Sequence, residues 1–109
     1  MRVFFESDGV VDWDTFHAVS QETFGFPDSY GRNMDAWIDC LTYVREGDGM
    51  SRFELEKDEM LEIEVSNTKA FSRRVPEVFD ALVECSAFVN SRNTGPVISL
   101  IFTEPPDTV

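Results

Sequence analysis

The sequence has few of the residues from which metal sites, disulfide scaffolds and hydrolytic centres are built. Its 109 residues include two cysteines and one histidine. Cys40 and Cys85 have neither CxxC nor Cys/His spacing, so we expect two reduced core residues in a reducing compartment. His17 has no second ligand and no adjacent nucleophile in the sequence, so we expect a helix-surface or half-buried residue rather than a catalytic base. The sequence therefore predicts neither a metal nor a cofactor.

A long hydrophobic run and the glycine patterns of common catalytic loops are also missing. The apolar run before Glu6 is only Val3, Phe4 and Phe5, which predicts neither a signal-peptide core nor a membrane span. Without a nucleophile elbow or a phosphate-binding glycine loop, the sequence argues against an enzyme. The length predicts one domain covering residues 1–109. We expect that domain in the cytoplasm.

Basic residues are scarce, with nine lysines and arginines against 21 aspartates and glutamates and a formal net charge of −12 at pH 7. Residues 1–64 hold sixteen acids and five bases, a net −11, whereas residues 65–109 hold five and four, a net −1. A field of this sign repels nucleic acid and anionic membranes and attracts a basic protein. A charge that serves solubility alone is the simpler interpretation. The crowding of acids around Asp35 and Asp39 favours a basic partner instead.

Capping residues and apolar stripes predict four helices. The start signals are Asp12 or Asp14 for the first helix and Asn33 for the second, and Gly25 marks the end of the first. Later helices start from Ser66 or Asn67 and from Pro76. With these signals the expected helices cover about residues 12–24, 33–41, 66–74 and 76–89.

Four segments predict strands. Residues 2–6 form a short apolar candidate, and the alternation of apolar and acidic residues in 53–56 and 61–65 predicts two half-buried strands. Residues 57–59 would join that pair as a hairpin with its glutamates on a wet face. The almost uniformly apolar segment 97–102 predicts a central strand buried on both faces. Together with the helices, these strands indicate an α/β fold with a small parallel sheet.

The most informative stretch is residues 27–41, a tight loop that leads into the helix capped by Asn33. An apolar stripe at helical spacing follows, and Asp35 and Asp39 fall side by side on a neighbouring face. Like charges four residues apart destabilise a helix by about 0.2–0.5 kcal/mol. Asp39 has no base four residues later to offset this cost. A tolerated local penalty of this kind indicates a functional surface.

The same stretch resembles a known family. Residues 30–41, Tyr-Gly-Arg-Asn-Met-Asp-Ala-Trp-Ile-Asp-Cys-Leu, are similar to the core motif of the barstar family, the intracellular inhibitors of barnase-type ribonucleases. Segments 16–17, 25–27 and 98–102 are similar to that family in kind and order. The resemblance covers most of the chain. It implies a three-stranded parallel sheet packed by helices, to which this sequence would add a strand or hairpin near residues 51–65.

The resemblance also implies an inhibitory surface that plugs the active-site cleft of a secreted ribonuclease. The residue matching Asp39 would take the place of the scissile phosphate and accept charge-assisted hydrogen bonds from arginine and histidine. Asp35 would pair with a further basic group, and Glu84 aligns with another inhibitory acid. The partner-binding residues implied on the loop, the second helix and the last helix are Ser29, Tyr30, Gly31, Asn33, Asp35, Ile38, Asp39, Thr42 and Glu84.

Several departures from the best-known inhibitor bear on the target. Ser29 and Ile38 stand where that inhibitor has aromatic contact residues, and Arg32 adds a positive charge to the loop. Residues 45–59 form a longer insertion with six acids. The alternative function is an acidic interaction module on the same fold that binds a basic protein without nuclease activity. We expect a monomer when free. The inhibitor hypothesis would fail if Asp35 and Asp39 were tied up in internal ion pairs or pointed to opposite sides of the molecule.

Overall fold

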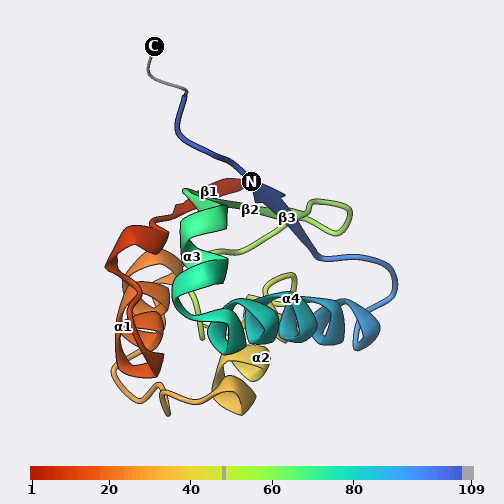
Figure 1. The fold of residues 1–109 in the computed structure, drawn as a ribbon. Helices are drawn as coiled ribbons and strands as arrows, with labels where there is room; N and C mark the ends of the chain where they lie inside the picture. Colours follow the sequence, from red (N-terminus) through yellow and green to blue (C-terminus); the bar gives the residue numbers. More distant parts are fainter. Residues whose placement is uncertain (48, 107–109) are drawn as a thin grey trace.

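The computed structural model describes residues 1–47 and 49–106. A parallel three-stranded sheet forms one layer and the helices form the other (Figure 1). This arrangement confirms the predicted α/β fold with its small parallel sheet. In chain order the elements are β1 (Arg2–Phe5), the 3-10 turn η1 (Ser7–Gly9), α1 (Trp13–Phe24), α2 (Met34–Thr42), β2 (Leu61–Val65), α3 (Thr68–Arg74), α4 (Pro76–Ser91) and β3 (Ile98–Phe102).

The strand order is β1-β2-β3, so β2 is the central strand. Its apolar residues are buried under the helices, whereas its two glutamates point to the outer face, where they are half-buried. On that face Arg2 of β1 lies 3.3 Å from the Glu62 carboxylate and 3.5 Å from the Glu64 carboxylate. The acidic–apolar alternation of β2 therefore reflects one core face and one charged face.

The predicted hairpin within residues 51–65 is wrong. Residues 53–56 form no strand, and the Leu55 N–H donates instead to the Val44 carbonyl at 2.9 Å. Phe53 and Leu55 are nevertheless buried. The apolar–acidic alternation thus arises from an irregular segment that packs beside the end of α2, and alternation alone does not distinguish this from a strand.

The prediction of a central strand buried on both faces at residues 97–102 is also wrong. β3 lies at the edge of the sheet, and of its residues only Ile98 is buried. Ile101 stands on the outer face, opposite Glu64 of β2. An apolar run is typical of a strand covered on both sides, but here the helices cover one side only (Figure 1).

Most of the predicted helix signals are confirmed. Asp12 begins α1 with a capping box, in which its carboxylate accepts the Thr15 N–H at 2.8 Å and the Thr15 hydroxyl accepts the Asp12 N–H at 3.0 Å. Gly25 ends α1 in the left-handed conformation, with a φ of 65°. Asn67 is the exception, because its φ is 44° and its side chain donates to Asp8 Oδ1 at 3.0 Å instead of capping α3.

Aromatic rings fill the space between the sheet and the helices. The ring of Phe5 lies 5.7 Å from that of Phe16 and 6.4 Å from that of Phe24, between centroids. Trp37 of α2 enters the same cluster, 6.4 Å from Phe16 and 6.1 Å from Phe24. The core therefore anchors α2 by one face and fixes the direction of its opposite face.

Asn90 joins α4 to β3, and its removal gives a testable prediction. Its Oδ1 accepts the N–H groups of Val97 and Ile98 at 2.7 and 2.8 Å, and its Nδ2 donates to the Ile98 carbonyl at 3.0 Å. We expect Asn90→Ala to lower the free energy of unfolding by about 1–3 kcal/mol, because backbone groups lose their partners. Denaturant unfolding measures this loss. The exposed neighbour variant Ser91→Ala should change it by less than about 0.5 kcal/mol, and equal losses would contradict the role of Asn90.

Candidate partner-binding site

The loop before α2 is held in place by α1. The Tyr30 N–H donates to the Pro27 carbonyl at 2.9 Å, and the Gln21 side chain of α1 donates to the same carbonyl at 3.0 Å. Arg32, with a φ of 54°, donates to Gln21 Oε1 at 3.3 Å. The positive charge of this loop is therefore directed toward α1.

Tyr30 and His17 form a buried pair beneath the loop. The Tyr30 hydroxyl lies 2.6 Å from His17 Nδ1, and both side chains are less than one-tenth exposed. The expectation of a surface or half-buried histidine is therefore wrong. Burial, followed by the charge of Arg32, lowers the pKa of His17, while Asp14 acts in the opposite direction. Burial raises the pKa of Tyr30, and the contact with His17 holds Tyr30 beneath the loop on its core side.

The lowered pKa of His17 predicts a pH dependence of stability. Between the folded-state pKa and the unfolded value of about 6.5, the unfolded chain binds more protons than the folded chain. The free energy of unfolding should therefore decline as the pH falls from about 7.5 to about 5.5. Denaturant unfolding at the two pH values measures the decline. His17→Gln should show little of it, and an undiminished decline in this variant would assign the effect to other groups.

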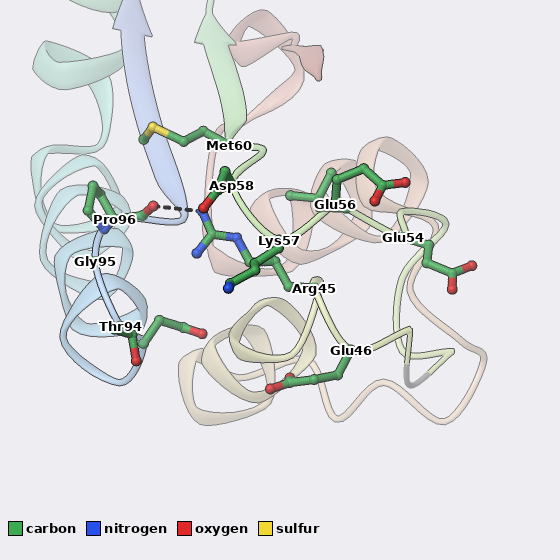
Figure 2. A pocket seen from close by; sticks show the side chains of 12 residues that line it. Arg45, Glu46, Glu54, Glu56, Lys57, Asp58, Met60, Thr94, Gly95 and Pro96 are labelled. Carbon is green, nitrogen blue, oxygen red and sulfur yellow. Dashed lines mark hydrogen bonds between the residues drawn. The ribbon is translucent and has the colours of Figure 1, made fainter.

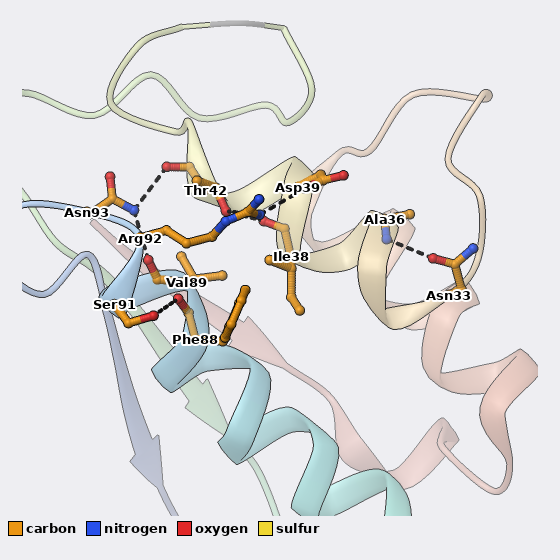
Figure 3. Close-up of polar contacts among 10 residues, drawn as sticks. All are labelled: Asn33, Ala36, Ile38, Asp39, Thr42, Phe88, Val89, Ser91, Arg92 and Asn93. Carbon is orange, nitrogen blue, oxygen red and sulfur yellow. Dashed lines mark hydrogen bonds and ion pairs between the residues drawn. The ribbon is translucent and has the colours of Figure 1, made fainter.

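α2 separates a core face from an exposed face. Asn33 Oδ1 accepts the Ala36 N–H at 2.8 Å, which confirms the predicted N-cap (Figure 3). Trp37 is fully buried, whereas Asp35 and Asp39 are exposed. Since residues four positions apart are neighbours on a helix surface, the two carboxylates share one side of α2.

The other predicted contact residues differ in exposure. Ser29 and Gly31 are exposed on the loop, and Glu84 is exposed on α4. Ile38 of α2 is half-buried. Thr42 is buried, and its hydroxyl donates to the Ile38 carbonyl at 2.6 Å. The Thr42 side chain therefore forms an internal hydrogen bond at the end of α2, and it is too buried to present a large contact area to a partner.

Glu84 is an exposed residue of α4, the helix that packs against α2. Cys85 of α4 follows Glu84 directly in the sequence. The pKa of the Cys85 thiol is raised first by burial and then by the negative charges of Glu84 and Asp35. Acids of two helices thus act electrostatically on one thiol of α4.

Asp39 is not free of internal contacts. Arg92, at the end of α4, places its Nη1 2.9 Å from Asp39 Oδ1 and 3.5 Å from Thr42 Oγ1 (Figure 3). Among the described residues Asp35 has no ion pair, so one of the two aspartates is paired internally and the other is not. The Asp39 side chain is still 63% exposed and that of Arg92 38%. Exposed pairs of this kind contribute about 0–1 kcal/mol, so a partner can displace this one.

Nothing in the sequence indicates Arg92 or Phe88 at this site. The sequence predicts a turn at residues 91–96, and no spacing connects Arg92 with a residue 53 positions earlier. Phe88 is 51% exposed, and the guanidinium carbon of Arg92 lies 5.5 Å from its ring centroid. We use the term α2/α4 surface for the following set: Asp35, Asp39, Glu84, Phe88 and Arg92.

Within the insertion, residues 45–46 and 54–58 line a groove of about 1100 Å³. In Figure 2, residues 54–60 lie on one side of this groove and residues 94–96 on the other. The guanidinium of Arg45 donates to the Glu59 carbonyl at 2.9 Å and to the Pro96 carbonyl at 3.0 Å. These bonds fix the insertion relative to the turn that precedes β3.

Comparison with known protein families identifies the family of this chain. A family profile described as Barstar (barnase inhibitor) matches residues 1–102. The chain belongs to the barstar family. The match spans nearly the whole chain, which confirms the resemblance based on residues 30–41. A search of curated proteins finds no match.

Membership of the barstar family makes this a barnase-inhibitor-like protein, and the members of that family are inhibitors rather than enzymes. Within the part of the chain that the structure describes, no group of three or more histidine, cysteine, aspartate or glutamate side chains is placed to hold a metal ion. No described helix is both long enough and apolar enough to cross a membrane. Among its five defined residues, the α2/α4 surface of this barstar-family chain carries three carboxylates, one aromatic ring and one guanidinium.

Proposed function

We propose that this protein inhibits a barnase-type ribonuclease by placing carboxylates of the α2/α4 surface in the cationic active site. The observation that carries the proposal is the position of Asp35 and Asp39, both exposed on one side of a helix whose other face is anchored in the core. A helix fixed in this way presents two negative charges at constant spacing. Glu84 adds a third charge from α4.

The chemistry of the proposed target matches this arrangement. A ribonuclease cleft holds the RNA phosphate with basic side chains, and a carboxylate accepts charge-assisted hydrogen bonds from the same groups. The net charge of −12 adds long-range attraction to a cationic enzyme. The barnase–barstar pair is itself the reference example of such steering, so we expect fast, salt-sensitive association here by analogy. The proposed setting is the cytoplasm, with the inhibitor monomeric when free.

A second candidate is an acidic interaction module that binds a basic protein without nuclease activity. Ser29 and Ile38 favour it, because they replace two aromatic contact residues of the best-known inhibitor, and aromatic anchors often dominate binding energy. Arg92 also places a cation within the surface. The two candidates predict the same contact surface on this chain and differ in whether the partner is a ribonuclease.

The test is to mix the protein with a panel of small cationic microbial ribonucleases and to measure RNA cleavage and binding at low and high salt. We expect inhibition of at least one enzyme, with stoichiometric binding and an association rate that falls steeply as salt rises. Binding to basic proteins of the same charge without any loss of ribonuclease activity would overturn the inhibitor proposal and favour the interaction module.

A further inference from the structure

We propose that Arg92 is an internal counter-ion of Asp39 that a partner must displace, and that it thereby restricts the partners this surface accepts. The inference rests on the proposed function, because it concerns the same surface. It adds a residue of opposite charge, from a part of the chain outside the recognised motif, that decides which cations reach Asp39. Without Arg92, any cationic group of a partner could pair with Asp39. With Arg92 in place, a partner cation binds there only if its contact with Asp39 is more favourable than the Arg92–Asp39 pair.

The guanidinium of Arg92 occupies the position that a cationic group of a partner would take beside Asp39. Arg92 Nη1 lies 2.9 Å from Asp39 Oδ1 and 3.5 Å from Thr42 Oγ1, and the guanidinium carbon lies 5.5 Å from the centroid of the Phe88 ring. A carboxylate, a hydroxyl and an aromatic face therefore surround one cation (Figure 3). A guanidinium from a partner would use the same three groups, since arginine pairs with carboxylates and stacks on aromatic rings.

The backbone beneath Arg92 is well anchored, so the contact is a product of the fold. The Arg92 N–H donates to the carbonyls of Phe88 and Val89 at 3.2 Å each. The next side chain, Asn93, donates to the Thr42 carbonyl at 3.2 Å and to the Val89 carbonyl at 2.9 Å. Asn93 thus ties the end of α4 to the end of α2, and Arg92 emerges beside Asp39 as a consequence.

The same geometry indicates which cationic side chain of a partner can displace Arg92 from Asp39. The internal pair uses one nitrogen and one carboxylate oxygen. A partner arginine that approaches in the plane of the carboxylate can donate two parallel hydrogen bonds, whereas a lysine donates from a single nitrogen. Displacement is therefore favourable for arginine and close to neutral for lysine. The displaced Arg92 also faces a cationic cleft, and this like-charge contact further penalises weak partners.

The experiment measures dissociation constants of the wild type and of Arg92→Gln against the ribonuclease panel at low salt. We expect Arg92→Gln to bind about three- to tenfold more tightly, because no internal pair has to be broken and one repelled charge is gone. The matched control is Arg73→Gln, which removes the same charge from an exposed position near the end of α3. It should tighten binding by less than about twofold, through the general field alone.

The larger effect of Arg92→Gln than of Arg73→Gln on affinity should depend on the Asp39 carboxylate. In an Asp39→Asn background, Arg92→Gln should change affinity no more than Arg73→Gln does. Replacing active-site arginines of a bound ribonuclease with lysine should weaken binding to the wild type more than binding to Arg92→Gln. Equal effects of Arg92→Gln and Arg73→Gln, or weaker binding by Arg92→Gln, would overturn the inference while leaving the proposed function intact.

If no ribonuclease binds any variant, the proposed function is overturned. The contact between Arg92 and Asp39 can then still be tested in the free protein. The side-chain Nε–H signal of Arg92 in the NMR spectrum of the free protein should move on Asp39→Asn and stay in place on Glu62→Gln, whose carboxylate lies on the outer face of the sheet. Equal responses to the two variants would show that Arg92 is not the counter-ion of Asp39, and the inference would fail independently of any partner.

Discussion

Asp39→Ala should weaken ribonuclease inhibition by more than about 2 kcal/mol, the usual threshold for a residue that dominates an interface. Asp39 is an exposed carboxylate of the α2/α4 surface, one helical turn from Asp35, and it already binds the guanidinium of Arg92. In a complex it would be removed from water among basic groups. Its loss would leave those groups buried without a counter-charge, which costs more than the loss of an exposed pair.

Inhibition constants measured for the wild type and variants test this expectation. Glu62→Ala is the matched control, since it removes one carboxylate from the outer face of the sheet, where Glu62 contacts Arg2. It should leave inhibition nearly unchanged, apart from a slower association rate at low salt. Similar losses for the two variants would mean that diffuse charge, rather than a defined docking surface, accounts for binding. The stability of Asp39→Ala should match that of the wild type within about 1 kcal/mol.

Trp37→Ala should lower the free energy of unfolding by about 3–5 kcal/mol, the range found for removal of large buried aromatic side chains. Trp37 is completely buried and contacts the rings of Phe16 and Phe24. Its truncation would open a cavity between α1, α2 and the sheet. A chain of this size has a total stability of about 5–15 kcal/mol, so much of the native population would be lost on mild heating.

Two further variants separate the cavity from other effects. Trp37→Phe keeps most of the ring volume and removes the indole N–H, which has no hydrogen-bond partner among the described residues. It should therefore cost much less than Trp37→Ala. Trp13→Ala, at a position 40% exposed, should also cost less. Denaturant unfolding compares the three, and a loss for Trp13→Ala as large as that for Trp37→Ala would place the critical aromatic contacts elsewhere.

The parts of the fold that could be predicted from the sequence are those set by local chemistry. The Asn33 cap, the capping position of Asp12 and the left-handed Gly25 each depend on residues within one helical turn. The apolar stripe of α2 likewise determines which side of the helix is exposed, so the spacing of Asp35 and Asp39 relative to that stripe is enough to predict that both lie on the surface.

The parts that could not be predicted depend on distant partners. The apolar segment at residues 97–102 does not reveal whether a strand lies at the centre or the edge of a sheet. Residues 53–56 alternate like a strand, yet their buried side chains fill a space beside α2. The pairing of Arg92 with Asp39 joins two helices through packing, and a single sequence carries no signal of it.

The uncovered face of the sheet has a consequence for the behaviour of the protein at high concentration. Phe4, 61% exposed, and the half-buried Ile101 lie on this face beside Glu64. Stacking two such faces would bury Glu62, Glu64 and Arg2, which is costly for charged groups. The edge strands β1 and β3 are short, with four and five residues, and β1 carries Arg2 whereas β3 carries no charge. The charges on the outer face of the sheet thus oppose face-to-face self-association, an effect beyond the solvation that the acidic–apolar pattern of β2 suggests.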